Sequence, residues 1–374
     1  MSHSAFVSIA PGLEEALADE LRDLGLRGKV EPGGVSLTAS DEDLWAIHLH
    51  SHLAGRVTIE LGAARVTTLD ALGARIRELP WKKYIWPSQP VEVKISQKGG
   101  HFRRREVVER KVLNAIQDAL RGPRLPGPRP PREPVSVLIR LDGDRGAFSI
   151  DASGELLHRR GWRKATAKAP LRENLAAAML RLADWDPGEA LVDPMCGSGT
   201  FGIEAACIAG GRAPGAWRPH ALQRWPSTDV KAWAAAVARA KEIHPIDATA
   251  PILVADRDDG AIEATRSNAE RARVLSRLTV RACPMQDLEP PAKTGLMIIN
   301  PPYGSRISGA NTIGTLYRSM GHTLRERWVG WRVAILLPAP KYMGSLRLPL
   351  VEVTNFKNGG IPVYLFAGVV PPPT

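Results

Sequence analysis

The sequence has few cysteines and no long apolar run, and both scarcities exclude classes of protein. Three cysteines, Cys196, Cys207 and Cys283, are too few and too scattered for a disulfide framework or a thiolate zinc site. No apolar run reaches the roughly 18 residues of a membrane span. Residues 1–12 lack the basic start and apolar stretch of a signal peptide. We therefore expect a cytoplasmic protein without a membrane segment.

Acidic residues are outnumbered by basic ones. Fifty Lys and Arg against 39 Asp and Glu give a formal net charge of +11 and a pI near 9.8. The common polyanionic partner of a basic cytoplasmic protein is nucleic acid, although heavy use of arginine alone gives the same balance. With 374 residues, 44% of them hydrophobic, the chain is long enough for two or three domains. A monomer is the expected state, but nothing in the sequence fixes it.

Residues 1–62 have the pattern of a small α+β unit. A strand is expected at 5–9 and another around 35–37, on either side of a helix with leucines at three- and four-residue spacing. His48 and His52 are four apart, as zinc ligands can be, but no third ligand lies nearby, so we predict no metal.

Residues 63–155 form a second α+β region with a basic segment. Strands are expected near 91–95 and 135–139, around a helix with an apolar stripe from Val108 to Leu120. Basic side chains precede that stripe at Lys98, Arg103, Arg104 and Arg105. Arginines in a first helical turn oppose the helix dipole, whereas a bound phosphate would be favoured there. We predict an RNA contact, with a solvated basic face as the alternative.

From residue 186 to 374, buried strands alternate with helices. The strands are expected at 190–193, 252–256, 278–281, 296–300 and 333–338. This alternation predicts an α/β fold with a mostly parallel sheet that binds ligands at the carboxyl ends of its strands. Two further strands, 350–356 and 361–369, flank the turn signal Lys357-Asn358-Gly359-Gly360. A parallel sheet closed by an antiparallel hairpin suits a methyltransferase better than a dehydrogenase.

A glycine-rich loop follows the first of these strands. Its candidate cofactor-binding residues are Asp193, Pro194, Cys196, Gly197, Ser198, Gly199 and Thr200. With Gly202 the glycines satisfy G-x-G-x-x-G, which lets backbone approach a ligand at a helix N-terminus. No base is evident to activate Cys196, so we expect it to pack rather than react.

The acid that ends the next strand distinguishes two cofactors. In a dinucleotide-binding fold, the acid that binds the ribose follows the glycine loop by about twenty residues. Here Asp256 follows Gly202 by 54 residues (256 minus 202). The insertion 210–251, with a capped helix after Ser227-Thr228-Asp229, therefore disfavours a nicotinamide cofactor. Asp256 can accept both ribose hydroxyls of S-adenosylmethionine, and Asp193 lies where the cofactor's amino group would sit. Helix capping is the alternative role of both acids.

The tetrapeptide Asn300-Pro301-Pro302-Tyr303 ends a buried strand and is the sharpest signal in the chain. Two prolines fix the backbone and remove two donors. The Asn300 side-chain oxygen and the Pro301 carbonyl can then accept both hydrogens of an exocyclic amine, while a flipped base stacks on Tyr303. This chemistry needs no metal and no strong base. A rigid turn is the structural alternative.

The loop and tetrapeptide, with Leu157-His158-Arg159-Arg160-Gly161-Trp162-Arg163, 169–176, Gly12-Leu13-Glu14 and Gly33-Gly34-Val35, resemble the THUMP-domain RNA methyltransferases. The nearest branch is the bacterial 23S ribosomal RNA guanine-N2-methyltransferases. The resemblance implies a ferredoxin-like region (1–62), a THUMP domain that docks RNA (63–155), a basic linker (156–185) and a class I methyltransferase domain (186–374).

The resemblance also assigns residues. It implies that Pro170, Leu171, Asn174 and Arg257 join the cofactor site. Where the family has an acid four residues before Leu288, this chain has Pro284, so Gln286, Asp287 or backbone must contact the adenine. In the linker, Arg159, Arg160 and Arg163 would contact phosphates near the target, unless they form a merely exposed basic segment.

Five other functions compete with guanine-N2 methylation of ribosomal RNA. The same chemistry on transfer RNA is the nearest. Adenine N6 or a protein glutamine is also methylated at an Asn-Pro-Pro-Tyr-like site. A non-catalytic RNA-binding or ribosome-assembly factor would keep the fold without turnover, and a nicotinamide oxidoreductase would use the glycine loop alone.

Overall fold

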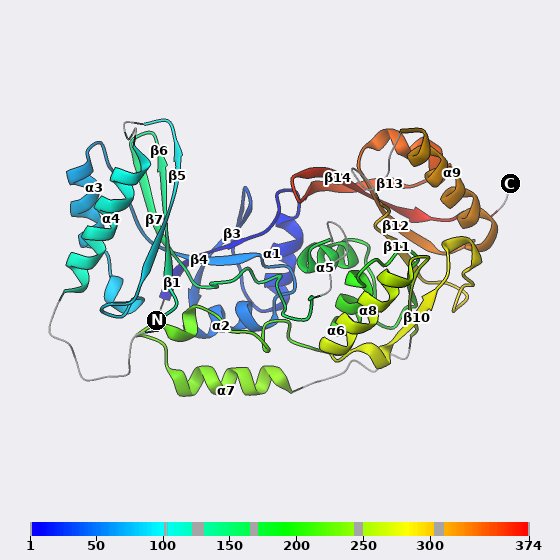
Figure 1. The fold of residues 1–374 in the computed structure, drawn as a ribbon, viewed down its shortest axis with the longest axis horizontal. Coiled ribbons are helices and arrows are strands. Elements are labelled where there is room, and N and C mark those ends of the chain that lie inside the picture. The colour runs from blue at the N-terminus through cyan, green and yellow to red at the C-terminus, as the bar shows by residue number, and fades with distance from the viewer. Residues whose placement is uncertain are drawn as a thin grey trace.

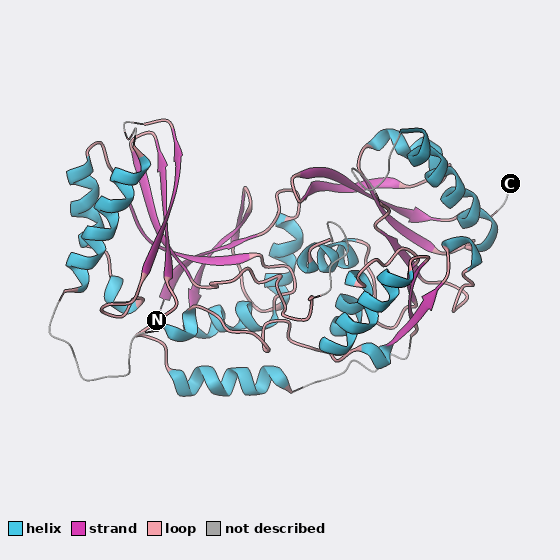
Figure 2. Ribbon diagram, in the orientation of Figure 1, coloured by secondary structure: helices cyan, strands magenta, loops and turns pink. Residues whose placement is uncertain are grey.

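The computed structural model describes residues 2–100, 102, 104–121, 131–164, 171–242, 250–302 and 310–372, which form two sheets (Figure 1, Figure 2). The strands of the first are β1 (Ser2–Ser8), β2 (Lys29–Glu31), β3 (Gly34–Ser40), β4 (Arg56–Arg65), β5 (Val91–Lys98), β6 (Val135–Asp142) and β7 (Arg145–Asp151). Their order in the sheet is β2-β3-β1-β4-β7-β6-β5. All but the parallel pair β5 and β6 are antiparallel.

Strand β4 joins the two α+β regions that the sequence separates. It pairs with β1 from Arg56 to Glu60 and with β7 from Thr58 to Arg65, with an irregularity between Glu60 and Gly62. The boundary expected at residue 62 therefore falls inside a strand. Because this long strand forms hydrogen bonds with a neighbour on each side, the strands of the two α+β regions form one continuous sheet.

Four helices cover this sheet. They are α1 (Glu14–Asp23), α2 (Asp41–His50), α3 (Leu69–Arg77) and α4 (Arg105–Leu120). Helix α1 buries the predicted leucine stripe, including Leu17 and Leu21, and α4 buries the apolar stripe from Val108 to Leu120. Helix α2 begins with a capping box in which the Ser40 hydroxyl and the Asp43 carboxylate each accept the other residue's backbone N–H.

The second sheet has the topology of a class I methyltransferase domain. Its strands are β8 (Leu191–Asp193), β9 (Ile252–Asp256), β10 (Leu278–Ala282), β11 (Leu296–Ile299), β12 (Arg332–Leu337), β13 (Val351–Asn358) and β14 (Ile361–Val369). In the order β10-β9-β8-β11-β12-β14-β13, only β14 runs antiparallel to its neighbours. The predicted parallel sheet with a C-terminal hairpin is confirmed.

Helices pack on both faces of this sheet. Helices α5 (Glu173–Leu182), α6 (Thr200–Ala209) and α8 (Asp259–Arg271) share one apolar core with it, and α9 (Ala310–Arg327) packs on the opposite face (Figure 2). Strand order reverses between β8 and β11, which is where open α/β sheets bind ligands. Within the described ranges, no helix combines the length and apolar content needed to cross a bilayer.

The C-terminal half contacts the N-terminal half through helix α7 (Val230–Lys241) and through the C-terminal hairpin. Helix α7, capped by Asp229 as the sequence predicts, lies along α2, where Trp233 meets Trp45 edge to face at 5.9 Å (Figure 1). At the hairpin, the Thr354 hydroxyl donates to the Gly12 carbonyl at 2.7 Å. A Cβ added at Gly12 would lie 2.0 Å from the Asn355 carbonyl oxygen, so this contact requires glycine.

Candidate active site

Three polar side chains meet at the carboxyl ends of adjacent strands. Strand β8 lies between β9 and β11 in parallel register, with Asp193 opposite Val254 and Val192 opposite Met297. Asp193 ends β8, Asp256 ends β9, and Asn300 directly follows β11. The strand-end acids and the Asn-Pro-Pro segment, far apart in sequence, therefore share one edge of the sheet.

The glycines of the loop have the conformations and clearances that the pattern predicts. Gly197 (φ +54°) and Gly199 (φ +83°) lie in the left-handed region, and Gly199 caps α6. A Cβ added at Gly202 would lie 2.3 Å from the Val254 side chain. The first two glycines make the tight turn, and the third lets α6 pack closely on β9.

The loop is fixed by partners on β9 and α8. The Gly197 N–H donates to Asp256 Oδ2 at 3.0 Å. Thr265 Oγ1 donates to the Gly197 carbonyl at 2.9 Å, and Asn268 Nδ2 donates to the Ser198 carbonyl at 3.1 Å. Sequence reasoning missed Thr265 and Asn268. The available signal was a pair of polar residues three apart on the buried stripe of α8, since both are fully buried.

Asp193 and Cys196 are both buried beneath this loop. Burial raises the pKa of the Asp193 carboxyl well above its usual value; the Met195 N–H opposes this at 3.2 Å, while the negative charge of Asp256 adds to it. Burial also raises the pKa of the Cys196 thiol, and the two acids add to the rise. The thiol therefore stays protonated and packs against Thr265, as expected for a residue without a nucleophilic role.

Asn300 presents an unsatisfied acceptor at the strand end. Its Oδ1 is buried and has no hydrogen-bond partner among the described residues. Pro301, which follows it, is buried, and Pro302 is half-buried. Neither proline has an N–H to compete for that oxygen. Tyr303, the predicted stacking residue, lies outside the described residues. A buried oxygen without a donor is costly unless a ligand supplies one.

Some of the remaining predicted cofactor residues are exposed, and others are buried. Arg257, Gln286 and Asp287 are exposed just beyond the ends of β9 and β10. Leu171 is buried, whereas Pro170 lies outside the described residues. Asn174 is buried; its Nδ2 donates to the Leu53 carbonyl at 3.1 Å, while its Oδ1 is buried without a partner among the described residues, so its cofactor role stays a prediction.

Two of the three linker arginines predicted to contact phosphates have internal partners instead of exposed guanidiniums. Arg160 is only 6% exposed; it donates to the carbonyls of Leu157 and His52 and lies 3.7 Å from the buried Glu204. Arg163 pairs with Glu173 at 3.0 Å and donates to the Thr200 hydroxyl at the start of α6. Because their partners are buried acids, carbonyls and a hydroxyl, these two guanidiniums stabilise the packing of the linker. Arg159 is exposed, and its guanidinium pairs with Glu155 at 3.0 Å.

A substitution at Arg163 distinguishes a role in protein stability from a role in RNA binding. Arg163→Lys keeps the charge beside Glu173 but loses the planar fork, so we expect the free energy of unfolding to fall by about 1–2 kcal/mol. Arg159→Lys, at a side chain that is 64% exposed, should change it by less than about 0.5 kcal/mol. Urea unfolding of both variants tests this, and equal stability would return Arg163 to the RNA-contact group.

The basic residues of the N-terminal half remain exposed where the sequence places them. Lys98 ends β5, and Arg104 and Arg105 begin α4. All three side chains are exposed, and Arg103 lies outside the described residues. Their contact with RNA stays a prediction. Across the described part of the chain, no three His, Cys, Asp or Glu side chains gather closely enough to hold a metal ion.

Comparisons with known protein families match both halves of the chain. Residues 160–362 match a family described as the RMKL-like methyltransferase domain, and residues 4–58 match the RlmL ferredoxin-like domain. A Synechocystis protein named as a candidate RNA methyltransferase is 32% identical over 366 residues, covering 96% of this chain and 95% of its own. The ribosomal RNA large subunit methyltransferase K/L of Saccharophagus degradans is 33% identical over 97% of this chain, which spans 50% of that relative's length.

Solved structures give the same fold. The crystal structure of SMU.472, described as a candidate methyltransferase in complex with S-adenosylhomocysteine, superposes with a TM-score of 0.89 at 28% identity, covering 100% of this chain and 99% of that one. A Listeria monocytogenes structure, described as a predicted N6-adenine-specific DNA methylase, gives 0.87 at 28% identity over 98% of this chain and 96% of its own.

Proposed function

Because the chain belongs to the RlmL-like methyltransferase family, we propose that it methylates the 2-amino group of a guanine in 23S ribosomal RNA, using S-adenosylmethionine. The observation that carries the proposal is the buried, unpartnered Oδ1 of Asn300 beside the glycine loop. An amine that donates hydrogens to this oxygen would lie at the ligand-binding edge of the sheet.

The residues at this edge suit S-adenosylmethionine. The turn made by Gly197 and Gly199 brings backbone close to a ligand. The two Asp256 oxygens accept from the Gly197 and Asp258 N–H groups, and each retains a lone pair for a further donor. We assign the ribose hydroxyls to Asp256 and the cofactor's ammonium to the neighbourhood of Asp193. The bound cofactor supplies a methyl group on a positively charged sulfur.

Asn300 and Pro301 act on the nucleophile. The Asn300 Oδ1 and the Pro301 carbonyl accept the two amine hydrogens, which turns the nitrogen lone pair out of conjugation with the base. The lone pair would then be free to accept the methyl group that the cofactor supplies, and the nitrogen would give up one proton to solvent. Burial of Asn300 Oδ1 fixes its position in advance of the reaction.

An RNA substrate is supported from two sides. The +11 net charge and the exposed Lys98, Arg104 and Arg105 favour a polyanion. The Synechocystis and Saccharophagus relatives are named for RNA, whereas the Listeria structure is described for DNA adenine. The two relatives that are named for RNA have a higher sequence identity to this chain than the Listeria protein, so we propose RNA as the substrate. A cytoplasmic location and a monomeric state stay predictions.

The raised pKa of Asp193 predicts how cofactor affinity depends on pH. A cation binds better to the ionised carboxyl, and the raised pKa keeps part of the free protein protonated where an ordinary Asp, with a pKa of about 3.9, is charged. Affinity should therefore rise with pH from about 4 toward neutrality, by up to about ten-fold per unit. Calorimetric titration at several pH values measures this; a flat profile, identical to that of Asp193→Asn, would contradict the assignment.

The proposed function is tested on total RNA from a strain that lacks the gene. Purified protein and S-adenosylmethionine with a labelled methyl group are added, and the RNA fractions are digested for nucleoside mass spectrometry. We expect labelled N2-methylguanosine in the large ribosomal RNA. Label in the transfer RNA fraction would change the substrate, and N6-methyladenosine would change the base. No label in any RNA, with cofactor binding intact, would overturn the proposal and direct trials to DNA and protein.

A further inference from the structure

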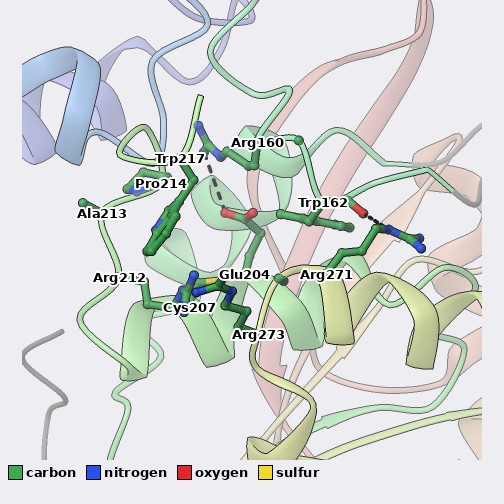
Figure 3. Close-up of a pocket in the computed structure, with 12 residues that line it drawn as sticks. Arg160, Trp162, Glu204, Cys207, Arg212, Ala213, Pro214, Trp217, Arg271 and Arg273 are labelled. Carbon is green, nitrogen blue, oxygen red and sulfur yellow. Dashed lines mark hydrogen bonds and ion pairs between the residues drawn. The ribbon is translucent and has the colours of Figure 1, made fainter. Parts of the chain in front are cut away.

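A second cavity lies away from the candidate active site. It has a volume of about 210 Å³ and runs along the second half of α6, beside the linker and the end of α8 (Figure 3). Its wall includes Cys207, which stands seven residues (207 minus 200) after Thr200, roughly 10 Å farther along the helix axis. The methyl-transfer chemistry assigned to Asn300 does not use this cavity.

The cavity wall carries an exposed aromatic ring surrounded by cations. Trp217 is 45% exposed, the most exposed tryptophan among the large apolar side chains on the described surface. The charged groups of Arg273, Lys241 and Arg212 lie 5.0, 5.2 and 5.5 Å from its ring centroid. In the described part of the chain, none of these three cations forms an ion pair. These are cation–π contacts, and no carboxylate among the described residues neutralises the three cations. An exposed indole and cations without a carboxylate partner at one opening are the two components that bind a nucleotide.

The interior of the cavity adds to the positive potential. Its only acidic lining residue is Glu204, which lies 3.7 Å from the guanidinium of Arg160 (Figure 3). The Arg160 Nε and Trp162 Nε1 donors are buried in the wall and have no acceptor among the described residues. Arg271 also lines the cavity, where it donates to the Trp162 carbonyl at 2.8 Å. One carboxylate thus faces four lining guanidiniums and Lys241.

We propose that this cavity binds a nucleotide of a single-stranded RNA segment, with a base against Trp217 and its phosphate between Arg212, Lys241 and Arg273. The inference rests on RNA being the substrate, and it adds a contact remote from the methylated base. Such a contact increases affinity for the RNA without touching the reacting atoms. Loss of the cavity's side chains should therefore raise the KM for RNA and leave kcat unchanged.

Two arginine substitutions form a matched pair that tests the contribution of positive charge to RNA binding. Arg273 (φ +57°) and Arg347 (φ +53°) are exposed arginines in the left-handed region, where glycine is favoured. Replacing either with glycine removes one charge and relieves the same backbone strain, so neither change should lower the thermal unfolding temperature. Only Arg273 borders the cavity; Arg347 follows the short helix α10 (Met343–Leu346).

The test measures binding of a fluorescent ten-nucleotide single-stranded RNA by anisotropy over a range of salt concentrations. Arg273→Gly should weaken binding several-fold and reduce the slope of log K against log salt by about 0.7, the value for one phosphate contact on a single strand. Trp217→Ala should weaken binding by about ten-fold and leave the slope unchanged, because a stacking contact carries no charge. Arg347→Gly should stay within two-fold of the wild type with its slope unchanged.

Three results would overturn the inference. They are equal affinity of the Arg273→Gly and Arg347→Gly variants, no effect of Trp217→Ala, and binding of free AMP with the same dependence on Trp217 but no binding of the RNA. Methyl transfer is assayed separately on the same proteins. If the wild type binds RNA through Trp217 and Arg273 but methylates none, the proposed function fails while the RNA-binding cavity stands.

Discussion

Replacing Asn300 with alanine is expected to lower kcat by about 10³-fold while the Kd for S-adenosylmethionine changes by less than about three-fold. The reason is that the side chain is assigned to the amine and not to the cofactor. Its buried Oδ1 has no partner among the described residues. Its removal leaves only the Pro301 carbonyl to accept an amine hydrogen, so the nitrogen lone pair is less well aligned. Single-turnover methyl transfer at saturating cofactor and RNA measures the first quantity, and calorimetry measures the second.

Asn355→Ala is the matched control for this experiment. Asn355 lies on β13 in the same domain, and its exposed side chain contacts only Glu352 among the described residues. This variant should keep kcat within two-fold of the wild type. Near-normal turnover by Asn300→Ala would remove Asn300 from the reaction and leave the Asn-Pro-Pro segment as a rigid turn.

The second large effect is expected at the cofactor. Asp256→Ala should raise the Kd for S-adenosylmethionine by about 100-fold, equivalent to about 2.7 kcal/mol, because it removes a charged acceptor assigned to two hydroxyls. It also removes the acceptor of the Gly197 N–H, so the loop loses one of its fixed points. At saturating cofactor, kcat should fall less than ten-fold, since the amine-binding groups remain.

Asp259→Ala separates this effect from a general change at the start of α8. Asp259 is exposed in the first turn of that helix, three residues after Asp256, and its carboxylate interacts with the helix dipole. Its loss should cost about 0.3–1 kcal/mol of stability and leave the cofactor Kd unchanged. If both variants weaken the cofactor equally, Asp256 acts through the helix start and not through a direct contact.

The sheet that carries the site was predictable because its signals are local. Parallel strands buried on both faces are short apolar runs, and the expected strand at 252–256 agrees with β9 at both ends. The glycine spacing indicated a tight turn, and Gly197 and Gly199 adopt the left-handed φ angles that such a turn uses. The polar residue at each strand end was therefore placed from the sequence before any contact was known.

Contacts between distant segments could not be predicted in the same way. Arg160 stands in a basic run that is typical of an exposed linker, but its partner Glu204 is 44 residues away (204 minus 160) on α6. Charge patterns do not reveal whether an acid elsewhere in the chain will be buried against them. The same limit applies to Asn174, whose acceptor is the Leu53 carbonyl, and to β4, whose two neighbours come from different regions.

The contacts of α7 with α2 and of Thr354 with Gly12 have a consequence for how a target is chosen. With the buried linker, they tie the two halves at separate places and oppose any hinge motion between them. These contacts would hold the exposed residues Lys98, Arg104 and Arg105 in one position relative to Asn300. Under the proposed function, the enzyme would select its target base by the distance of that base from an RNA segment docked at these basic residues, a mode of selection that needs no contact with the neighbouring bases.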